Sequence, residues 1–158
     1  LALGERRHMI AELLQELLGV RSVYLRTERG IGHLEGVELH DGPLAGETPP
    51  PEVLIRVHHG LQFAVNLTEG QKTGYYLDQR DNRAAVMRLA AGRRVLDAFS
   101  YSGGFGVYAA KGGASEVLCV DASEPALKLA ERNATLNGLG QITYKHADVF
   151  NHLGELSG

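Results

Sequence analysis

The sequence predicts an α/β fold, in which a parallel sheet built of strand–helix–strand units follows a smaller α+β module. Beyond residue 70, short apolar segments alternate with helix-like segments through glycine-bearing connections, an order that is typical of a parallel sheet. Before residue 70, one amphipathic segment precedes segments that alternate in polarity. We therefore predict two domains, a small α+β module over residues 1–70 and a larger domain over residues 71–158.

The small module begins with an amphipathic helix. Its apolar residues from Met9 to Leu18 recur three and four positions apart, and Gly19 suits the end of a helix. Near the end of the module, His59 and Gly60 separate two segments of alternating polarity, which predicts a hairpin. The remaining expectations are a short strand over 22–27, turns over 28–46, and hairpin strands over 53–57 and 61–67.

The larger domain is predicted to begin with a helix near Asp78, whose carboxylate can cap the free N–H groups of the first helical turn. The three strands that follow are few for a parallel sheet, so we expect the chain to hold only the front half of a longer domain. The predicted strands are 94–99, 116–121 and 142–146, and the predicted helices are 78–92, 104–111, 124–137 and 151–156.

Composition excludes several classes of protein. The 158 residues carry a formal charge of -3 and 44% apolar residues, which is ordinary for a globular protein. No apolar segment approaches the ~20 residues that cross a bilayer, so no membrane partner is expected. The single cysteine, Cys119, excludes an internal disulfide and a multi-cysteine zinc site, and it fits a reducing, cytoplasmic location. The histidines lack metal-ligand spacing, so no metal is expected, and no pattern indicates an oligomeric state.

A glycine-bearing turn is predicted where the strand over 94–99 meets the next helix. Asp97 stands near the end of that strand, Gly103 and Gly104 open the helix, and Asp121 ends the next strand. Ligands of parallel sheets bind where the carboxyl ends of the strands meet, and this turn lies at such an end. A carboxylate before the turn repels a pyrophosphate but pairs with an ammonium group, which favours S-adenosylmethionine over a dinucleotide. Asp121 would then accept hydrogen bonds from the ribose hydroxyls. Asp148, just past the predicted strand over 142–146, would accept one from the adenine amino group, with Val149 or Phe150 near the adenine ring.

Each of these features alone also occurs in α/β folds without a cofactor, but their coincidence at three strand ends favours a cofactor site. From Gly70 onward the chain resembles the RlmI-type family of class I methyltransferases, which methylate carbon five of cytosine in large-subunit ribosomal RNA. The usual acid-x-G-x-G-x-G turn of methyltransferases is varied here, because Phe99 and Tyr101 stand in place of its first two glycines. The residues that carry the resemblance are 70–83, 95–105, 120–123, Ala126, Leu127 and Asn133.

The resemblance implies a Rossmann-like class I methyltransferase sheet with S-adenosylmethionine as cofactor. Residues 71–94 carry six basic and two acidic groups, and by the resemblance they form a flap over the cofactor or face RNA, with an arginine meeting the methionine carboxylate. An exposed helix face is the alternative for Arg80 and Arg83. The implied cofactor-binding residues are Asp97, Phe99, Ser100, Tyr101, Gly103, Gly104, Asp121, Ser123 and Asp148, with Lys72, Tyr76, Arg80 and Arg83 in the flap.

By the same resemblance the function is S-adenosylmethionine-dependent methylation of RNA. Carbon five of cytosine is a weak nucleophile, so such enzymes first add a thiolate to carbon six. Cys119 stands in an apolar strand segment and is predicted to be buried, so the nucleophile is expected beyond Gly158 and the chain alone is expected to be inactive. The alternatives are a methyltransferase of guanine or of a non-RNA substrate, and a non-catalytic RNA-binding module with the same fold.

Overall fold

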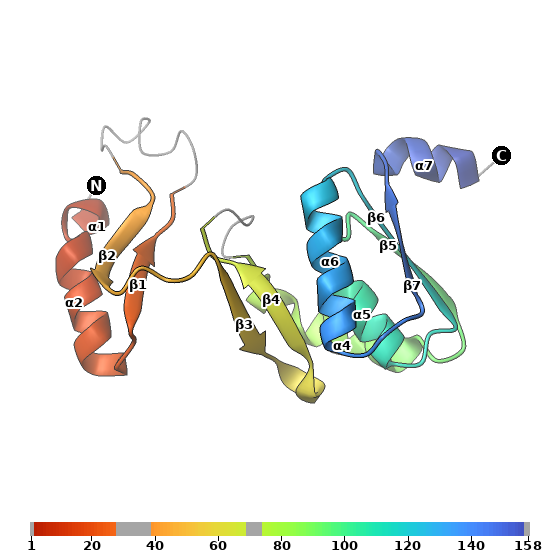
Figure 1. Ribbon diagram of the computed structural model, residues 1–158, viewed down its shortest axis with the longest axis horizontal. Helices are drawn as coiled ribbons and strands as arrows, with labels where there is room; N and C mark the ends of the chain where they lie inside the picture. The colour runs from red at the N-terminus through yellow and green to blue at the C-terminus, as the bar shows by residue number, and fades with distance from the viewer. Residues whose placement is uncertain (1, 28–38, 69–73, 157–158) are drawn as a thin grey trace. The chain divides into compact units, whose positions relative to one another are not determined.

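The computed structural model describes residues 2–27, 39–68 and 74–156 (Figure 1). They form two compact units, Leu1–Val53 with Asn66–Gly74, and Leu54–Val65 with Tyr75–Gly158. The hairpin predicted before residue 70 therefore lies mainly within the second unit, and a domain boundary at residue 70 stays a prediction. No helix within the described ranges combines the length and apolar character that crossing a bilayer requires.

In the first unit, helix α2 packs on a two-stranded antiparallel sheet. The helix ends where predicted, because Gly19 adopts the left-handed conformation (φ +62°) that closes a helix, and Ala11 on its inner side is fully buried. Strand β2 corrects the prediction of turns over 28–46: Gly42 and Pro43 look like turn residues but pair with β1. The elements are α1 (Ala2–Glu5), α2 (Arg7–Leu18), β1 (Ser22–Leu25) and β2 (Gly42–Gly46).

The predicted hairpin is confirmed. A short 3-10 turn joins its strands, and within it His59 adopts a left-handed conformation (φ +62°) next to Gly60 (φ +71°). Phe63, Ala64 and Val65 of the second strand are buried, so this strand contributes to a hydrophobic core. The hairpin consists of β3 (Glu52–Arg56), η1 (His58–Gly60) and β4 (Gln62–Asn66).

A three-stranded parallel sheet in the order β5-β6-β7 forms the centre of the second unit (Figure 1). The strands begin at the predicted residues and end within one residue of the predicted ends. Because Arg94 pairs with Glu116 and Val117 with Ile142, the carboxyl ends of the strands meet at one edge of the sheet. The elements are η2 (Leu77–Gln79), α4 (Arg80–Leu89), β5 (Arg94–Ala98), α5 (Gly104–Lys111), β6 (Glu116–Asp121), α6 (Glu124–Leu136), β7 (Ile142–His146) and α7 (Val149–Leu156).

Helices α5 and α6 pack against one face of this sheet. Gly106 lets α5 approach closely, because a Cβ there would lie 2.6 Å from Sγ of Cys119 and 3.2 Å from Oδ2 of Asp97. Tyr108 of α5 and Val117 of β6 are fully buried in the same layer. This packed face anchors the strands whose ends carry the predicted site residues.

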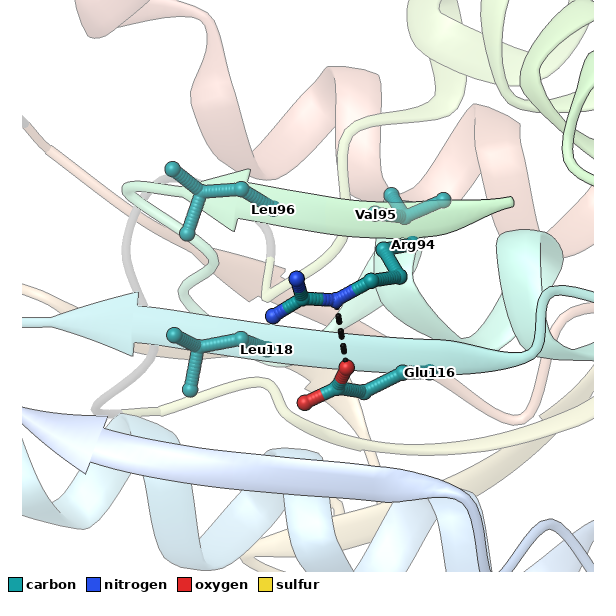
Figure 2. A pocket seen from close by; sticks show the side chains of 5 residues that line it. All are labelled: Arg94, Val95, Leu96, Glu116 and Leu118. Carbon is teal, nitrogen blue, oxygen red and sulfur yellow. Dashed lines mark hydrogen bonds and ion pairs between the residues drawn. The ribbon is translucent and has the colours of Figure 1, made fainter. Parts of the chain in front are cut away.

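The opposite face of the sheet carries a shallow hollow (Figure 2). Leu96 and Leu118 lie side by side there, and Leu96 is 39% exposed. Beside them, Nε of Arg94 donates a 2.7 Å hydrogen bond to the carboxylate of Glu116. Because this ion pair joins the first residues of the two strands, the hollow lies toward their amino ends, away from the edge where the predicted site residues stand.

Helix α4 begins later than predicted and lacks the predicted cap. The 3-10 turn η2 precedes it, Gln79 is its N-cap residue, and no side chain makes a capping hydrogen bond. The carboxylate of Asp78 instead accepts a hydrogen bond from Nε2 of Gln79 (3.0 Å). The prediction followed the capping preference of aspartate, but the 3-10 turn moves the first helical turn two residues along the chain.

Candidate functional site

The segment that joins β5 to α5 turns sharply at the carboxyl edge of the sheet. Phe99 (φ +60°), Tyr101 (φ +47°) and Gly103 (φ +73°) adopt left-handed backbone conformations, and Ser100 between them is buried. For the two residues with side chains this conformation costs about 1–3 kcal/mol each, so surrounding contacts must hold it. At Gly103 a side chain is also excluded sterically, because a Cβ would lie 2.9 Å from Cβ of Ala130. Strained turns of this kind concentrate at ligand-binding sites.

Asp97 holds the helical end of this turn. Its Oδ2 accepts a hydrogen bond from the backbone N–H of Gly106 (2.8 Å), and Sγ of Cys119 lies 3.9 Å away. Burial raises the pKa of the Asp97 carboxyl to about 6, against the lowering effect of the Gly106 hydrogen bond. A cation that approached this carboxyl would favour its ionised form. The geometry therefore suits Asp97 to attract a positively charged group of a ligand.

Asp121 ends β6 and holds the turn from the neighbouring strand. Its Oδ2 accepts a hydrogen bond from the backbone N–H of Tyr101 (2.8 Å), and its Oδ1 accepts one from the N–H of Ser123 (2.9 Å). Each carboxylate oxygen can accept a second hydrogen bond, so Asp121 can also bind a pair of hydroxyls. Ser123 caps α6, because its Oγ accepts from the N–H of Ala126 (3.4 Å).

Asp148 and Phe150 follow the third strand, and Phe150 meets the ring of Phe99, which follows the first strand. Oδ1 of Asp148 accepts a hydrogen bond from the N–H of Asn151 (2.9 Å) and so caps the first turn of α7. The rings of Phe99 and Phe150 meet edge to face, 5.5 Å between centroids, and are 59% and 73% exposed. Such rings form an apolar surface on which a flat heteroaromatic group can pack.

Arg83 is buried, so the alternative of an exposed helix face is wrong for this residue. The residue is 3% exposed, and its guanidinium carbon lies 4.3 Å from the centre of the Tyr75 ring. Its Nη2 donates a hydrogen bond to the carbonyl of Tyr76 (2.9 Å), whereas its Nε has no hydrogen-bond partner within the described part of the chain. A Cβ on Gly104 would lie 3.5 Å from Cδ of Arg83, which places the arginine beside the start of α5.

The other residues of the predicted flap have different positions. The rings of Tyr76 and Tyr101 meet edge to face at 6.3 Å, so Tyr76 lies next to the turn. Arg80 is exposed and pairs through Nε with Asp81 (3.1 Å), and no hydrogen bond or ion pair joins it to the turn within the described ranges. Lys72 lies outside the described residues.

Two residues at this edge were not predicted as part of a site. Nδ2 of Asn133 donates a hydrogen bond to the carbonyl of Ser102 (3.0 Å) inside the turn, and Tyr75 stacks on the buried guanidinium of Arg83. The resemblance included Asn133 and the segment around Tyr75 without giving either a role. An asparagine within an amphipathic helix is the one sequence signal that could have singled out Asn133.

The chemistry of this edge suits a ligand with a cation, a diol and a flat ring. Three carboxylates stand at three strand ends, and the buried guanidinium beside α5 can take an anionic group. Within the described ranges no three histidine, cysteine, aspartate or glutamate side chains gather so as to hold a metal ion.

Comparison with known proteins agrees with this chemistry. A family model described as S-adenosylmethionine-dependent methyltransferase matches residues 43–158. The chain is 48% identical to the Ribosomal RNA large subunit methyltransferase I of Tolumonas auensis over 94% of its own length, and 44% identical to that of Aeromonas hydrophila over 95%. It spans 38% of the length of each of these relatives.

Among solved structures, too, the chain is similar to methyltransferases. A candidate SAM-dependent methyltransferase from Streptococcus mutans is 28% identical, with a TM-score of 0.79 over 96% of this chain and 39% of that one. A candidate methyltransferase complexed with SAH (S-adenosylhomocysteine) matches equally, over 96% of this chain and 38% of that one. These matches confirm the predicted Rossmann-like methyltransferase sheet and the cofactor, S-adenosylmethionine. The chain belongs to the family of S-adenosylmethionine-dependent methyltransferases.

Proposed function

We propose that this chain forms the cofactor-binding part of an enzyme that transfers a methyl group from S-adenosylmethionine to large-subunit ribosomal RNA, at carbon five of a cytosine. The observation that carries the proposal is the set of three carboxylates at the carboxyl ends of β5, β6 and β7, two of which, Asp97 and Asp121, hold one strained turn. The name that the curated relatives share, Ribosomal RNA large subunit methyltransferase I, supports the RNA substrate. The proposed ribosomal substrate supports a cytoplasmic location.

Each part of the cofactor finds matching chemistry at this edge. The carboxylate of Asp97 attracts the ammonium group, and both oxygens of Asp121 accept hydrogen bonds from the ribose hydroxyls. Asp148 accepts a hydrogen bond from the adenine amino group, and the adenine ring packs against Phe99 and Phe150. When bound, the cofactor supplies a methyl group on a cationic sulfur. The protein's part is to bind and orient this methyl donor.

Arg83 suits the carboxylate of the cofactor's methionine part. A buried guanidinium is costly without an anion or a full set of acceptors, and Nε of Arg83 has no hydrogen-bond partner within the described part of the chain. It lies beside Gly104, where a Cβ would lie 3.5 Å from Cδ and 3.9 Å from Nη1 of Arg83. We assign the methionine carboxylate to this place, and we assign Tyr76 to the wall between it and the turn.

Cys119 does not suit the role of the thiolate that attacks cytosine. The residue is fully buried, and burial raises the pKa of its thiol far above the ordinary value, with the neighbouring Asp97 adding to the rise. A thiol that stays protonated and enclosed is not a nucleophile. In this proposal the catalytic nucleophile and further RNA-binding residues lie outside the 158 residues of the chain.

The first test is binding of the cofactor product. Isothermal titration calorimetry should detect binding of S-adenosylhomocysteine to the chain and no binding of NADH, because a pyrophosphate is repelled by the strand-end carboxylates. Absence of S-adenosylhomocysteine binding would overturn the proposed cofactor site.

The second test concerns the substrate. A chimera in which this chain replaces the matching segment of the Tolumonas auensis relative should transfer labelled methyl groups to unmodified large-subunit ribosomal RNA. The label should appear in 5-methylcytosine, and at limiting S-adenosylmethionine it should decrease when the chimera also carries Asp121→Ala. Label in guanine would favour the alternative substrate, and a chimera that binds cofactor without transferring methyl would favour a non-catalytic module.

A further inference from the structure

Two asparagines on α6 contact the same strand of the hairpin. Oδ1 of Asn133 accepts a hydrogen bond from the N–H of Ala64 (2.7 Å). One helical turn later, Oδ1 of Asn137 accepts from the N–H of Gln62 (2.9 Å), and its Nδ2 donates to the carbonyl of the same Gln62 (2.7 Å). The two amides therefore hold the backbone of β4 on α6 at alternate residues.

Only one of these amides also reaches the cofactor turn. Nδ2 of Asn133 donates a 3.0 Å hydrogen bond to the carbonyl of Ser102, in the middle of the turn. The remaining hydrogen bond of Nδ2 of Asn137 goes instead to the carbonyl of Asn133, within α6 (2.7 Å). Asn133 is fully buried and Ser102 is 3% exposed, so water does not compete for this contact.

Two hydrogen bonds, one at the oxygen and one at the nitrogen, determine the orientation of the Asn133 amide. Its oxygen must face the N–H of Ala64 and its nitrogen must face the carbonyl of Ser102, because a flipped amide would lose both hydrogen bonds. The position of β4 thus determines where the donor to the turn stands. Asp97 and Asp121 hold the turn through other residues, by hydrogen bonds from the N–H groups of Gly106 and Tyr101.

We propose that Asn133 is a positioning residue, which couples the β3–β4 hairpin to the cofactor turn and holds that turn in its binding conformation. This inference rests on the proposed function only in that the turn binds S-adenosylmethionine. Displacement of β4 by a bound substrate or partner would move the Asn133 amide and, with it, the carbonyl of Ser102. The hairpin is then an element through which cofactor affinity is adjusted.

A matched pair of substitutions tests the coupling. Asn133→Asp keeps the acceptor for Ala64 and replaces the donor to Ser102 by an oxygen, whereas Asn137→Asp makes the same change one turn away without touching the cofactor turn. By calorimetry, we expect affinity for S-adenosylhomocysteine to fall about tenfold or more in Asn133→Asp and clearly less in Asn137→Asp, which loosens β4 but leaves the hydrogen bond to Ser102 in place. Equal affinities of the two variants would overturn the proposal.

Hydrogen exchange provides a readout that does not depend on the cofactor. The N–H groups of Tyr101 and Gly103 should exchange faster in Asn133→Asp, or in the milder Asn133→Ser if the first variant does not fold, and should change clearly less in Asn137→Asp. Unchanged exchange in the Asn133 variants would overturn the coupling. If wild type does not bind S-adenosylhomocysteine, the proposed function fails while this test still decides on the coupling.

The wild-type protein gives a third readout, which no folding defect affects. On titration with S-adenosylhomocysteine, the side-chain NH2 resonances of Asn133 should shift, because their acceptor belongs to the turn, and those of Asn137 should not. Equal shifts of both amides, or none at Asn133, would contradict the proposal.

Discussion

The backbone N–H of Tyr101 donates a 2.8 Å hydrogen bond to Oδ2 of Asp121, so the end of β6 holds the left-handed turn that follows β5. The other oxygen of the same carboxylate accepts from the N–H of Ser123 at the start of α6. Asp121 therefore orders the backbone on both sides of the place where we put the ribose. Substitution of this residue should affect the shape of the turn and the binding of the diol together.

The first prediction concerns Asp121 itself. Asp121→Ala should weaken binding of S-adenosylhomocysteine by about 5- to 150-fold, since a lost charge-assisted hydrogen-bonding partner is worth ~1–3 kcal/mol. Asp121→Asn should also weaken it, because one oxygen becomes an NH2 group that faces a backbone donor. Calorimetry measures both, with Glu131→Gln, an exposed acid on α6, as the control. Unchanged affinity in Asp121→Ala would remove this residue from the site.

The second prediction concerns the close approach of α5 to the sheet. Gly106→Ala places a Cβ 2.6 Å from Sγ of Cys119, and overpacking of this kind destabilises a fold by about 1–3 kcal/mol. Gly140→Ala is the matched control, because a Cβ there meets no atom of the described residues within 4 Å. Urea unfolding should show a lower free energy of unfolding for the first variant alone. Adding Cys119→Ala, which removes the sulfur, should restore part of the loss; no restoration would mean that another contact causes it.

Much of the fold could be predicted because local patterns decide it. The segments after residue 94 alternate apolar strands with glycine-ended helices, and their predicted and observed ends agree closely. Strand β2 could not be predicted, because Gly42 and Pro43 favour turns and become strand residues only through pairing with β1. The start of α4 was misplaced for a related reason, since the 3-10 turn before it is not visible in the capping preference of Asp78.

The candidate site also contains residues that the sequence predicts and residues that it does not. Its acids were predictable, because residues at the ends of parallel strands must meet at one edge. The burial of Arg83 was not, because its spacing from Arg80 looks like a solvated helix face. It is the rings of Tyr75 and Tyr108, 4.3 Å and 5.8 Å from its guanidinium carbon, that enclose it, and they come from other segments.

The third prediction is a pH dependence of stability. Burial raises the pKa of Asp97 from 3.8 to about 6, so between these pH values the folded protein holds a proton that the unfolded chain has lost. The contribution of Asp97 to the free energy of unfolding should therefore fall as pH rises from about 4 to about 6, by up to about 3 kcal/mol, and stay level above.

Asp97→Asn isolates this contribution. The amide keeps an acceptor for the N–H of Gly106 and removes the titration, while every other titrating group remains. Urea unfolding at about pH 4.5 and pH 7 should show that wild type loses more stability than the variant as pH rises. Equal pH dependence in the two proteins would contradict a buried, protonated Asp97.

The fourth prediction is that the thiol of Cys119 does not react in the folded protein. It is fully buried, and burial and the neighbouring Asp97 both raise its pKa, so little thiolate forms and reagents cannot reach it. A thiol reagent such as DTNB should modify no cysteine in the native chain and one in urea, because the sequence holds a single cysteine. Rapid modification of the native protein would reopen a chemical role for this residue.

The fifth prediction assigns a specific part of the cofactor to Arg83. Arg83→Lys keeps a positive charge but loses the planar fork that binds a carboxylate through two hydrogen bonds. Affinity for S-adenosylhomocysteine should fall about tenfold or more. Affinity for 5′-methylthioadenosine, which has the nucleoside but lacks the amino-acid part, should not change, because this ligand offers no carboxylate to the guanidinium.

The neighbouring arginine provides the control for this comparison. Arg80 lies one helical turn earlier on α4, is exposed and pairs with Asp81, so Arg80→Lys should leave the affinities for both ligands unchanged. If Arg83→Lys weakened the affinity for both ligands equally, Arg83 would act on the shape of the turn rather than on the carboxylate. Since a damaged turn weakens every contact to the nucleoside, the ratio of the two affinities separates a residue that binds the methionine part from one that only supports the fold.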